Sequence, residues 1–164
     1  MRLIIASLVA VACCSPATFA FQTSGTARAK SSVRACSLLT KELIKTVTPE
    51  DTKALDIYFT GAPEEDSLGA GGTDCAYGGI AIQIDPNFSY DTFKRQTGWE
   101  HAEPVVGLGD EALFHDNIGE WAELIVRSGA HLLTIRMDVP RGRTAESIKP
   151  NVIALAKALL PKIQ

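Results

Sequence analysis

Hydrophobic and polar residues alternate along the second half of the chain, a pattern typical of β-strands. One strand is expected in GGIAIQID (78–85), whose three isoleucines fall on one face. Three more strands are expected at ALFH (112–115), EWAELIVRS (120–128) and AHLLTIRMDV (130–139). Glycine-containing segments of hairpin length separate these last three strands, so the pattern predicts an antiparallel meander.

Apolar residues spaced three and four apart predict helices on either side of these strands. SLLTKELIKTV (37–47) has this spacing, and a second short helix is expected from Thr48 to about Leu55, followed by a brief strand at 57–59. The C-terminal helix should run from about Thr144 to Leu160, becoming regular near Pro150. We therefore expect an α+β fold, an antiparallel β-meander sheet with N-terminal and C-terminal helices packed on one face.

Two stretches are rich in glycine. GAPEEDSLGAGGTD (61–74) is a loop by composition, and no helix follows its glycines as a dinucleotide-binding fingerprint would require. In VVGLGDEALFHD (105–116), Gly107 and Gly109 favour a tight corner before a strand. Asp110 is expected to hydrogen-bond within its own turn.

The first residues of the chain resemble a secretory signal peptide. A basic start, a short apolar run and small residues up to Ala20 predict cleavage after that position. Ala10-Val11-Ala12 before Cys13 loosely resembles a lipobox, so a lipid-anchored Cys13 is the alternative to a secreted or periplasmic protein. The expected organisation is a signal peptide at 1–20, a flexible leader at 21–35 and a single α+β domain at 36–164.

Charge and apolar content narrow the classes of function. The chain carries a formal net charge of −3, with its basic residues scattered, so no basic face for nucleic acid is expected. No transmembrane segment is expected after the signal.

Two cysteines, Cys36 and Cys75, remain after the predicted cleavage. In an oxidising compartment they favour a disulfide, which would stabilise the fold by roughly 4 kcal/mol in the chain-entropy model. The alternative is a reactive thiol, but neither cysteine has a basic neighbour in the sequence to lower its pKa.

Candidate catalytic and metal-binding groups are sparse. His115 and His131 are expected on neighbouring strands, with Asp110, Asp116 or Glu123 within reach, but no HxxxH, HxH or CxxC spacing pre-places two ligands. No GxSxG or SxxK element is present for nucleophilic hydrolysis. We therefore assign no catalytic residue, no metal ligand and no cofactor.

A possible binding surface surrounds Trp121. This residue shares a strand face with Ile125 and is expected to face Leu132 on the next strand. If helices leave that face uncovered, a partly exposed apolar patch with Arg127 and Arg136 would remain and would mark a binding surface.

Three motifs in order resemble a group of uncharacterised bacterial exported proteins, some of them lipoproteins. They are C-x-LLT at Cys36, Cys-x-Tyr at Cys75 and the GLGDEA corner, and the resemblance covers most of residues 36–163. It implies a secreted or periplasmic location, a Cys36–Cys75 bridge and no established catalytic activity.

The sequence therefore favours a non-enzymatic exported module that binds a small ligand or an envelope protein. The alternative is a small hydrolase or metal-dependent enzyme that uses Asp110 and His115 of the corner. A purely structural envelope component is a third possibility.

Overall fold

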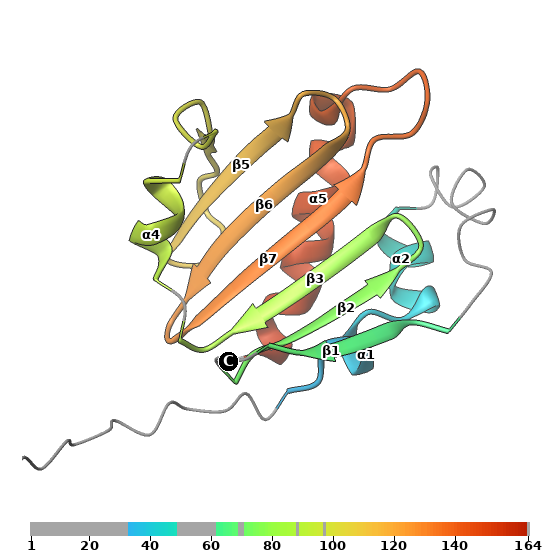
Figure 1. The fold of residues 1–164 in the computed structure, drawn as a ribbon. Coiled ribbons are helices and arrows are strands. Elements are labelled where there is room, and N and C mark those ends of the chain that lie inside the picture. The colour runs from blue at the N-terminus through green and yellow to red at the C-terminus, as the bar shows by residue number, and fades with distance from the viewer. Residues whose placement is uncertain (1–32, 49–61, 69–70, 88, 97, 164) are drawn as a thin grey trace, which may run out of the picture.

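A seven-stranded antiparallel sheet forms the centre of the computed structural model, which describes residues 33–48, 62–68, 71–87, 89–96 and 98–163 (Figure 1). Across the sheet the strands follow the order β1 (Glu64–Ser67), β2 (Thr73–Tyr77), β3 (Ile80–Asp85), β7 (His131–Asp138), β6 (Trp121–Ser128), β5 (Glu111–Asn117) and β4 (Glu103–Pro104). The predicted meander is confirmed, because β5, β6 and β7 are consecutive and antiparallel neighbours.

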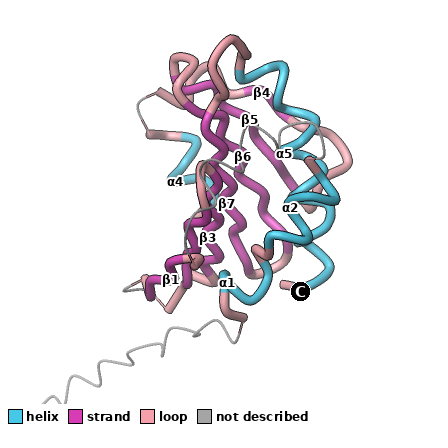
Figure 2. Tube along the Cα trace, turned by 90° about the vertical axis from the view of Figure 1, so that its right-hand side faces the viewer, coloured by secondary structure: helices cyan, strands magenta, loops and turns pink. Residues whose placement is uncertain are grey.

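Three helices cover one face of this sheet, as predicted. They are α1 (Ala35–Leu38), α2 (Lys41–Val47) and α5 (Ala145–Leu159), and Figure 2 shows them in one layer beside the strands. A short 3₁₀ helix, Leu160–Lys162, follows α5. The fully buried side chains between helices and sheet include Ile82, Leu124 and Ile135 from the strands and Ile148 and Leu155 from α5.

The regular part of the C-terminal helix was predicted to start near Pro150, but α5 is already helical from Ala145. Thr144 is the N-cap, and it forms a capping box with Ser147. Pro150 lies inside the helix rather than at its start. Its missing N–H leaves the carbonyl of Glu146 without a helical donor. Both residues are exposed, so this carbonyl can be hydrated.

The N-terminal helix is split, where the apolar spacing predicted one continuous element. α1 ends at Leu38, and Thr40 caps α2 by accepting a hydrogen bond from the amide of Leu43. Ala35 is fully buried in α1, so the folded part of the chain starts before Cys36.

Part of the predicted loop at 61–74 is wrong, because residues 64–67 form the edge strand β1. Glu64–Ser67 has no apolar alternation, since an edge strand needs little burial, and so its sequence resembles a loop. The Cys36–Cys75 disulfide joins α1 to the neighbouring strand β2, and its two cysteines are 39 residues apart in the sequence. Cys75 is completely buried there.

Several predicted elements lie outside the described residues. These are the signal peptide at 1–20, the leader up to residue 32, the helix after Thr48 and the strand at 57–59. Among the described helices, none is long and apolar enough to cross a membrane.

The connection from β3 to β4 passes over the face of the sheet opposite α5. It carries α4 (Tyr90–Lys94), which lies on that side in Figure 2. Tyr90 and Trp99 pack there against Ile125 and Leu132 in a second, smaller core. Burial raises the pKa of Tyr90 to about 12. This connection covers only part of the face. We call the remainder the open face; it lies over β1, β2, β3, β7 and the start of β6, at Trp121 and Glu123.

Candidate functional site

The GLGDEA corner is a structural element. Gly107 and Gly109 have φ of +76° and +61°, and Leu108 between them is only 3 % exposed. A Cβ on Gly109 would lie 2.4 Å from the carbonyl oxygen of Arg127, so the strand β6 leaves room for glycine alone. The predicted tight corner is confirmed.

Asp110 stabilises a neighbouring hairpin rather than its own turn, which corrects the sequence-based expectation. Its Oδ2 accepts a hydrogen bond from the amide of Gly129, 2.8 Å away in the β6–β7 turn. Arg127 Nη1 lies 3.7 Å from the same oxygen. This carboxylate is therefore occupied in joining two hairpins.

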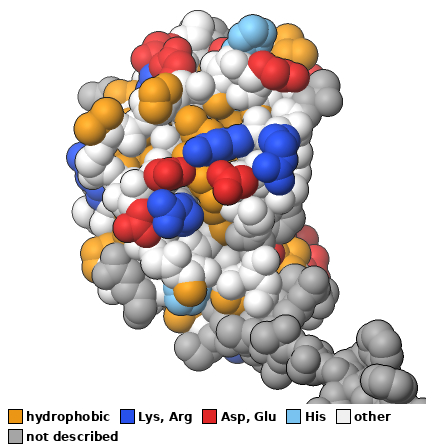
Figure 3. Space-filling model, turned by 90° about the vertical axis from the view of Figure 1, so that its left-hand side faces the viewer, with side chains coloured by type: hydrophobic (Ala, Val, Ile, Leu, Met, Phe, Trp, Pro, Cys, Tyr) orange, Lys and Arg blue, Asp and Glu red, His pale blue; other side chains and the backbone are white. Residues whose placement is uncertain are grey.

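Further ion pairs extend from this corner across the outer surface of the sheet. Glu111 pairs with Lys94 of α4, at 3.1 Å, and with Arg127, at 3.5 Å. Figure 3 shows this side of the molecule, where basic and acidic side chains alternate above apolar ones. The hydrogen bond from Lys94 lowers the pKa of Glu111. Lys94, Arg127, Asp110 and Glu111 are thus paired with one another on this surface.

His115 lies at the other end of β5, away from Asp110. It is opposite Glu123 in the sheet register, and its ring stacks on Trp99 with centroids 4.8 Å apart. Its Nδ1 is buried and finds no hydrogen-bond partner among the described residues. The structure places His115 and Asp110 at opposite ends of β5 and does not bring them together.

The three histidines are also separated from one another. His131 begins β7, and β6 lies between β7 and β5, so the expectation that His115 and His131 occupy neighbouring strands is wrong. His101 is exposed in the loop before β4. Within the described ranges, no group of three His, Cys, Asp or Glu side chains is placed to hold a metal ion.

A hollow in which several polar and charged side chains converge lies beside the end of β5, and we call it the edge cleft. It forms because β4 pairs only with Leu113 and Phe114, so that the last residues of β5 pair with β6 on one side and with no described strand on the β4 side. Its volume is about 550 Å³. Its lining comes from three separate segments: Gly98, His101, Glu103, Phe114, His115, Asp116, Asn117, Ile118 and Glu146.

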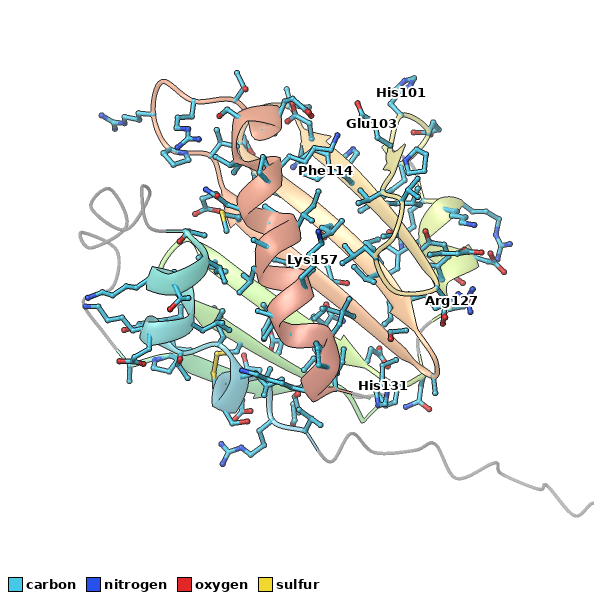
Figure 4. The ribbon with its side chains drawn as sticks, turned by 180° about the vertical axis from the view of Figure 1, so that it is seen from behind. His101, Glu103, Phe114, Arg127, His131 and Lys157 are labelled. Atoms are coloured by element: carbon cyan, nitrogen blue, oxygen red, sulfur yellow. A yellow bond between two sulfur atoms is a disulfide. The ribbon has the colours of Figure 1, made fainter. Side chains whose placement is uncertain are left out.

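A lysine from α5 holds one wall of the edge cleft in place. Lys149 pairs with Glu103 of β4 and with Glu146, and its Nζ lies 4.8 Å from the centre of the Phe114 ring. The hydrogen bond from Lys149 to Glu103 raises the pKa of the lysine. Figure 4 shows His101, Glu103 and Phe114 at the end of the sheet where α5 begins. The wall is thus fixed, whereas His101 is exposed to solvent.

Ile118 at the mouth of the edge cleft has an unfavourable conformation. It is 95 % exposed, and its φ is +53°, in the left-handed region that β-branched residues avoid. It occupies the first central position of a turn in which the amide of Glu120 donates to the carbonyl of Asn117, with Gly119 also at positive φ. Two positive φ values define a type I′ turn, in which Asn and Gly are the preferred residues.

A second, smaller hollow of about 220 Å³ lies on the open face, and we call it the polar hollow. It is lined by Asp74, Ala81, Ile82, Gln83, Glu123, Thr134 and Arg136. Burial raises the pKa of Glu123, an effect that the charges of His115 and Arg136 reduce. Burial also raises the pKa of Asp74, and the charge of Asp66 adds to this.

The apolar patch expected around Trp121 does not form. Trp121 is opposite Asp138 rather than Leu132, and the guanidinium of Arg136 lies over its ring at 4.1 Å. Ile125 and Leu132 belong to the part of the face that α4 and Trp99 cover. The polar hollow was not predictable from the sequence, because β1 and β2 lack a clear strand pattern, and without them Asp74 and Gln83 could not be placed on one face.

No protein-family model matches the chain, and no significant similarity to a curated protein or to a solved structure is found. The fold and the sites define a disulfide-linked α+β domain whose antiparallel sheet is covered by helices on one face and partly covered on the other.

Proposed function

We propose that this protein is a non-enzymatic exported module, secreted or periplasmic, that binds a small ligand in the edge cleft. The Cys36–Cys75 disulfide is consistent with an oxidising compartment. The signal-like start at 1–20 and the resemblance to bacterial exported proteins support the same location. A lipid-anchored Cys13 is the alternative form of the exported protein.

The observation that carries the proposal is Ile118. A left-handed conformation costs a residue with a Cβ roughly 1–2 kcal/mol, and this side chain recovers almost nothing by burial. Strain of this kind persists where it serves function. Ile118 supplies an apolar contact at the mouth of a hollow whose other groups are mostly polar.

The chemistry of the cleft indicates a ligand with both apolar and polar parts. A volume of about 550 Å³ lies within the range typical of small-molecule sites, roughly 300–1,000 Å³. An apolar part would contact Ile118, while the ring nitrogens of His101 and the amide of Asn117 are available for hydrogen bonds to the polar part.

The experiment compares two exposed apolar residues. The protein is purified from its native envelope without denaturant, and the small molecules that accompany it are identified by mass spectrometry. Ile118→Asn should lose the ligand. Val106→Asn, which replaces a side chain that is 97 % exposed and lies outside the cleft lining, should retain it. Equal retention by the two variants would contradict the proposal.

A further inference from the structure

Acidic side chains collect on the open face. The alternation along each strand directs Glu64, Asp66, Asp74, Glu123 and Asp138 away from the helices. One arginine, Arg136, lies among these five carboxylates, whereas the whole chain has 19 acidic and 16 basic residues. Among the described residues, this face therefore carries more acidic than basic side chains.

The single arginine does not neutralise this region. Its guanidinium is held over the Trp121 ring, and one of its nitrogens lies 3.8 Å from Asp138. Asp66 and Asp74 are directly opposite each other on β1 and β2, and like charges in that position repel. A cation placed between them and Glu123 would relieve this repulsion.

Two polar groups in the polar hollow have no partner within the described part of the chain. Oδ1 of Asp74 is buried and accepts no hydrogen bond. Thr134 is only 7 % exposed, and no hydrogen bond from a described residue involves its hydroxyl. Buried polar groups are normally satisfied, so each is available to a donor that enters the hollow.

We propose that the open face binds a basic peptide segment of a partner protein and that one lysine or arginine side chain enters the polar hollow between Asp74 and Glu123. Ala81 forms a small floor that leaves room for this side chain, and the hydroxyl of Thr134 and the amide of Gln83 lie on the same surface. The remaining acids, Glu64 and Asp66 on β1, would pair with further basic residues of the segment.

A peptide fits these observations better than a free metabolite. The polar hollow, at about 220 Å³, is smaller than the roughly 300 Å³ at which small-molecule sites begin, but the acids around it extend over several strands. An extended peptide places alternate side chains on one side, so several of its basic residues can meet this surface together. This surface shares no lining residue with the edge cleft, so the two proposals stand independently.

The test measures binding of a fluorescein-labelled peptide, (Lys-Thr)₄, by fluorescence anisotropy at low ionic strength. The double variant Asp74→Asn plus Glu123→Gln removes two charges at the hollow with little change in side-chain shape. The matched control, Glu42→Gln plus Asp91→Asn, removes two charges from exposed positions on α2 and α4. The protein should bind the lysine peptide but not (Glu-Thr)₄, and affinity should fall as salt is added.

The double variant should bind the lysine peptide at least tenfold more weakly, and the control should stay within twofold of the unchanged protein. An equal loss in both variants would show that net charge alone attracts the peptide and would overturn the proposal. Absence of binding, or displacement by spermidine at an equal concentration of charge, would also overturn it. Amide NMR shifts in the unchanged protein give an independent readout that needs no variant, and they should cluster at Ala81, Gln83 and Thr134.

Discussion

The two ends of β5 meet the same conformational demand with different residues. At the start of the strand, the corner uses Gly107 and Gly109 at positive φ, and it buries Leu108 between them. At the end, the turn places Ile118 at positive φ, and almost all of its side chain is exposed. Glycine adopts this conformation without steric cost, whereas isoleucine does not.

The difference distinguishes residues that the fold explains, in the corner, from a residue that it does not explain, Ile118 in the turn. Every polar and glycine position of the corner has an explanation within the fold, including Asp110, which joins the β6–β7 hairpin. The fold gives no reason for isoleucine at position 118. The corner has the residues that stability requires, and the turn carries a residue that reduces stability beside the edge cleft.

The largest expected effect comes from breaking the corner. Gly109→Ala should lower the free energy of unfolding by about 3 kcal/mol, because its Cβ would meet the Arg127 carbonyl oxygen and positive φ adds strain. Gly107→Ala is the control, with open space around its Cβ, and should cost only about 1 kcal/mol. Urea unfolding of both variants measures the difference, and equal losses would show that the close approach to β6 is unimportant.

A smaller loss should follow from removing the carboxylate of the corner. Asp110→Ala should cost about 1.5 kcal/mol, because the amide of Gly129 loses its acceptor and Arg127 loses one of its two acidic partners. Asp116→Ala at the other end removes a hydrogen bond only within its own turn, to the amide of Gly119, and should cost less. Thermal unfolding ranks the two, and the reverse order would contradict the assignment of Asp110 as a link between hairpins.

Relieving the strain of the turn should instead stabilise the protein. Ile118→Asn places a residue that tolerates the left-handed region before Gly119, and the free energy of unfolding should rise by about 1 kcal/mol. Val106→Asn should leave it unchanged, since this equally exposed residue has no positive φ. A destabilised Ile118→Asn variant would mean that the isoleucine makes contacts that offset its strain.

The smallest effect concerns Glu123, which lies opposite His115 near the turn. Burial raises its pKa, so the folded state holds the proton more tightly than the unfolded state. Stability is therefore lost as pH rises from the unfolded pKa, about 4.3, through the higher folded pKa. Glu123→Gln should be more stable than the unchanged protein at pH 7, and this advantage should vanish near pH 3.5. An advantage that persists at pH 3.5 would show that it does not arise from ionisation.

Strong periodicity made the central part of the fold predictable from the sequence. The isoleucines of β3 and the alternation through β6 and β7 indicate which strand side chains are buried. The stripe of apolar residues along α5 indicates which face of the helix packs on the sheet. The tight corner at Gly107 and Gly109 was also predicted, because positive φ has a clear residue preference.

The candidate sites were much less predictable, because they depend on register and on which segments meet. The edge cleft combines His101, Phe114, Ile118 and Glu146, whose proximity follows from the short β4 and from the start of α5. The sequence placed His115 and His131 on adjacent strands, but the meander inserts β6 between them.

The sequence by itself determined the α+β class, the helical cover on one face and the corner before β5, since each of these follows from local periodicity or from glycine's conformational freedom. Only the tertiary structure decided that β1 and β2 extend the sheet and that the β3–β4 connection covers part of the opposite face. Those outcomes depend on pairing between residues far apart in the chain, which no local pattern encodes. The edge cleft and the acidic open face both result from that long-range pairing.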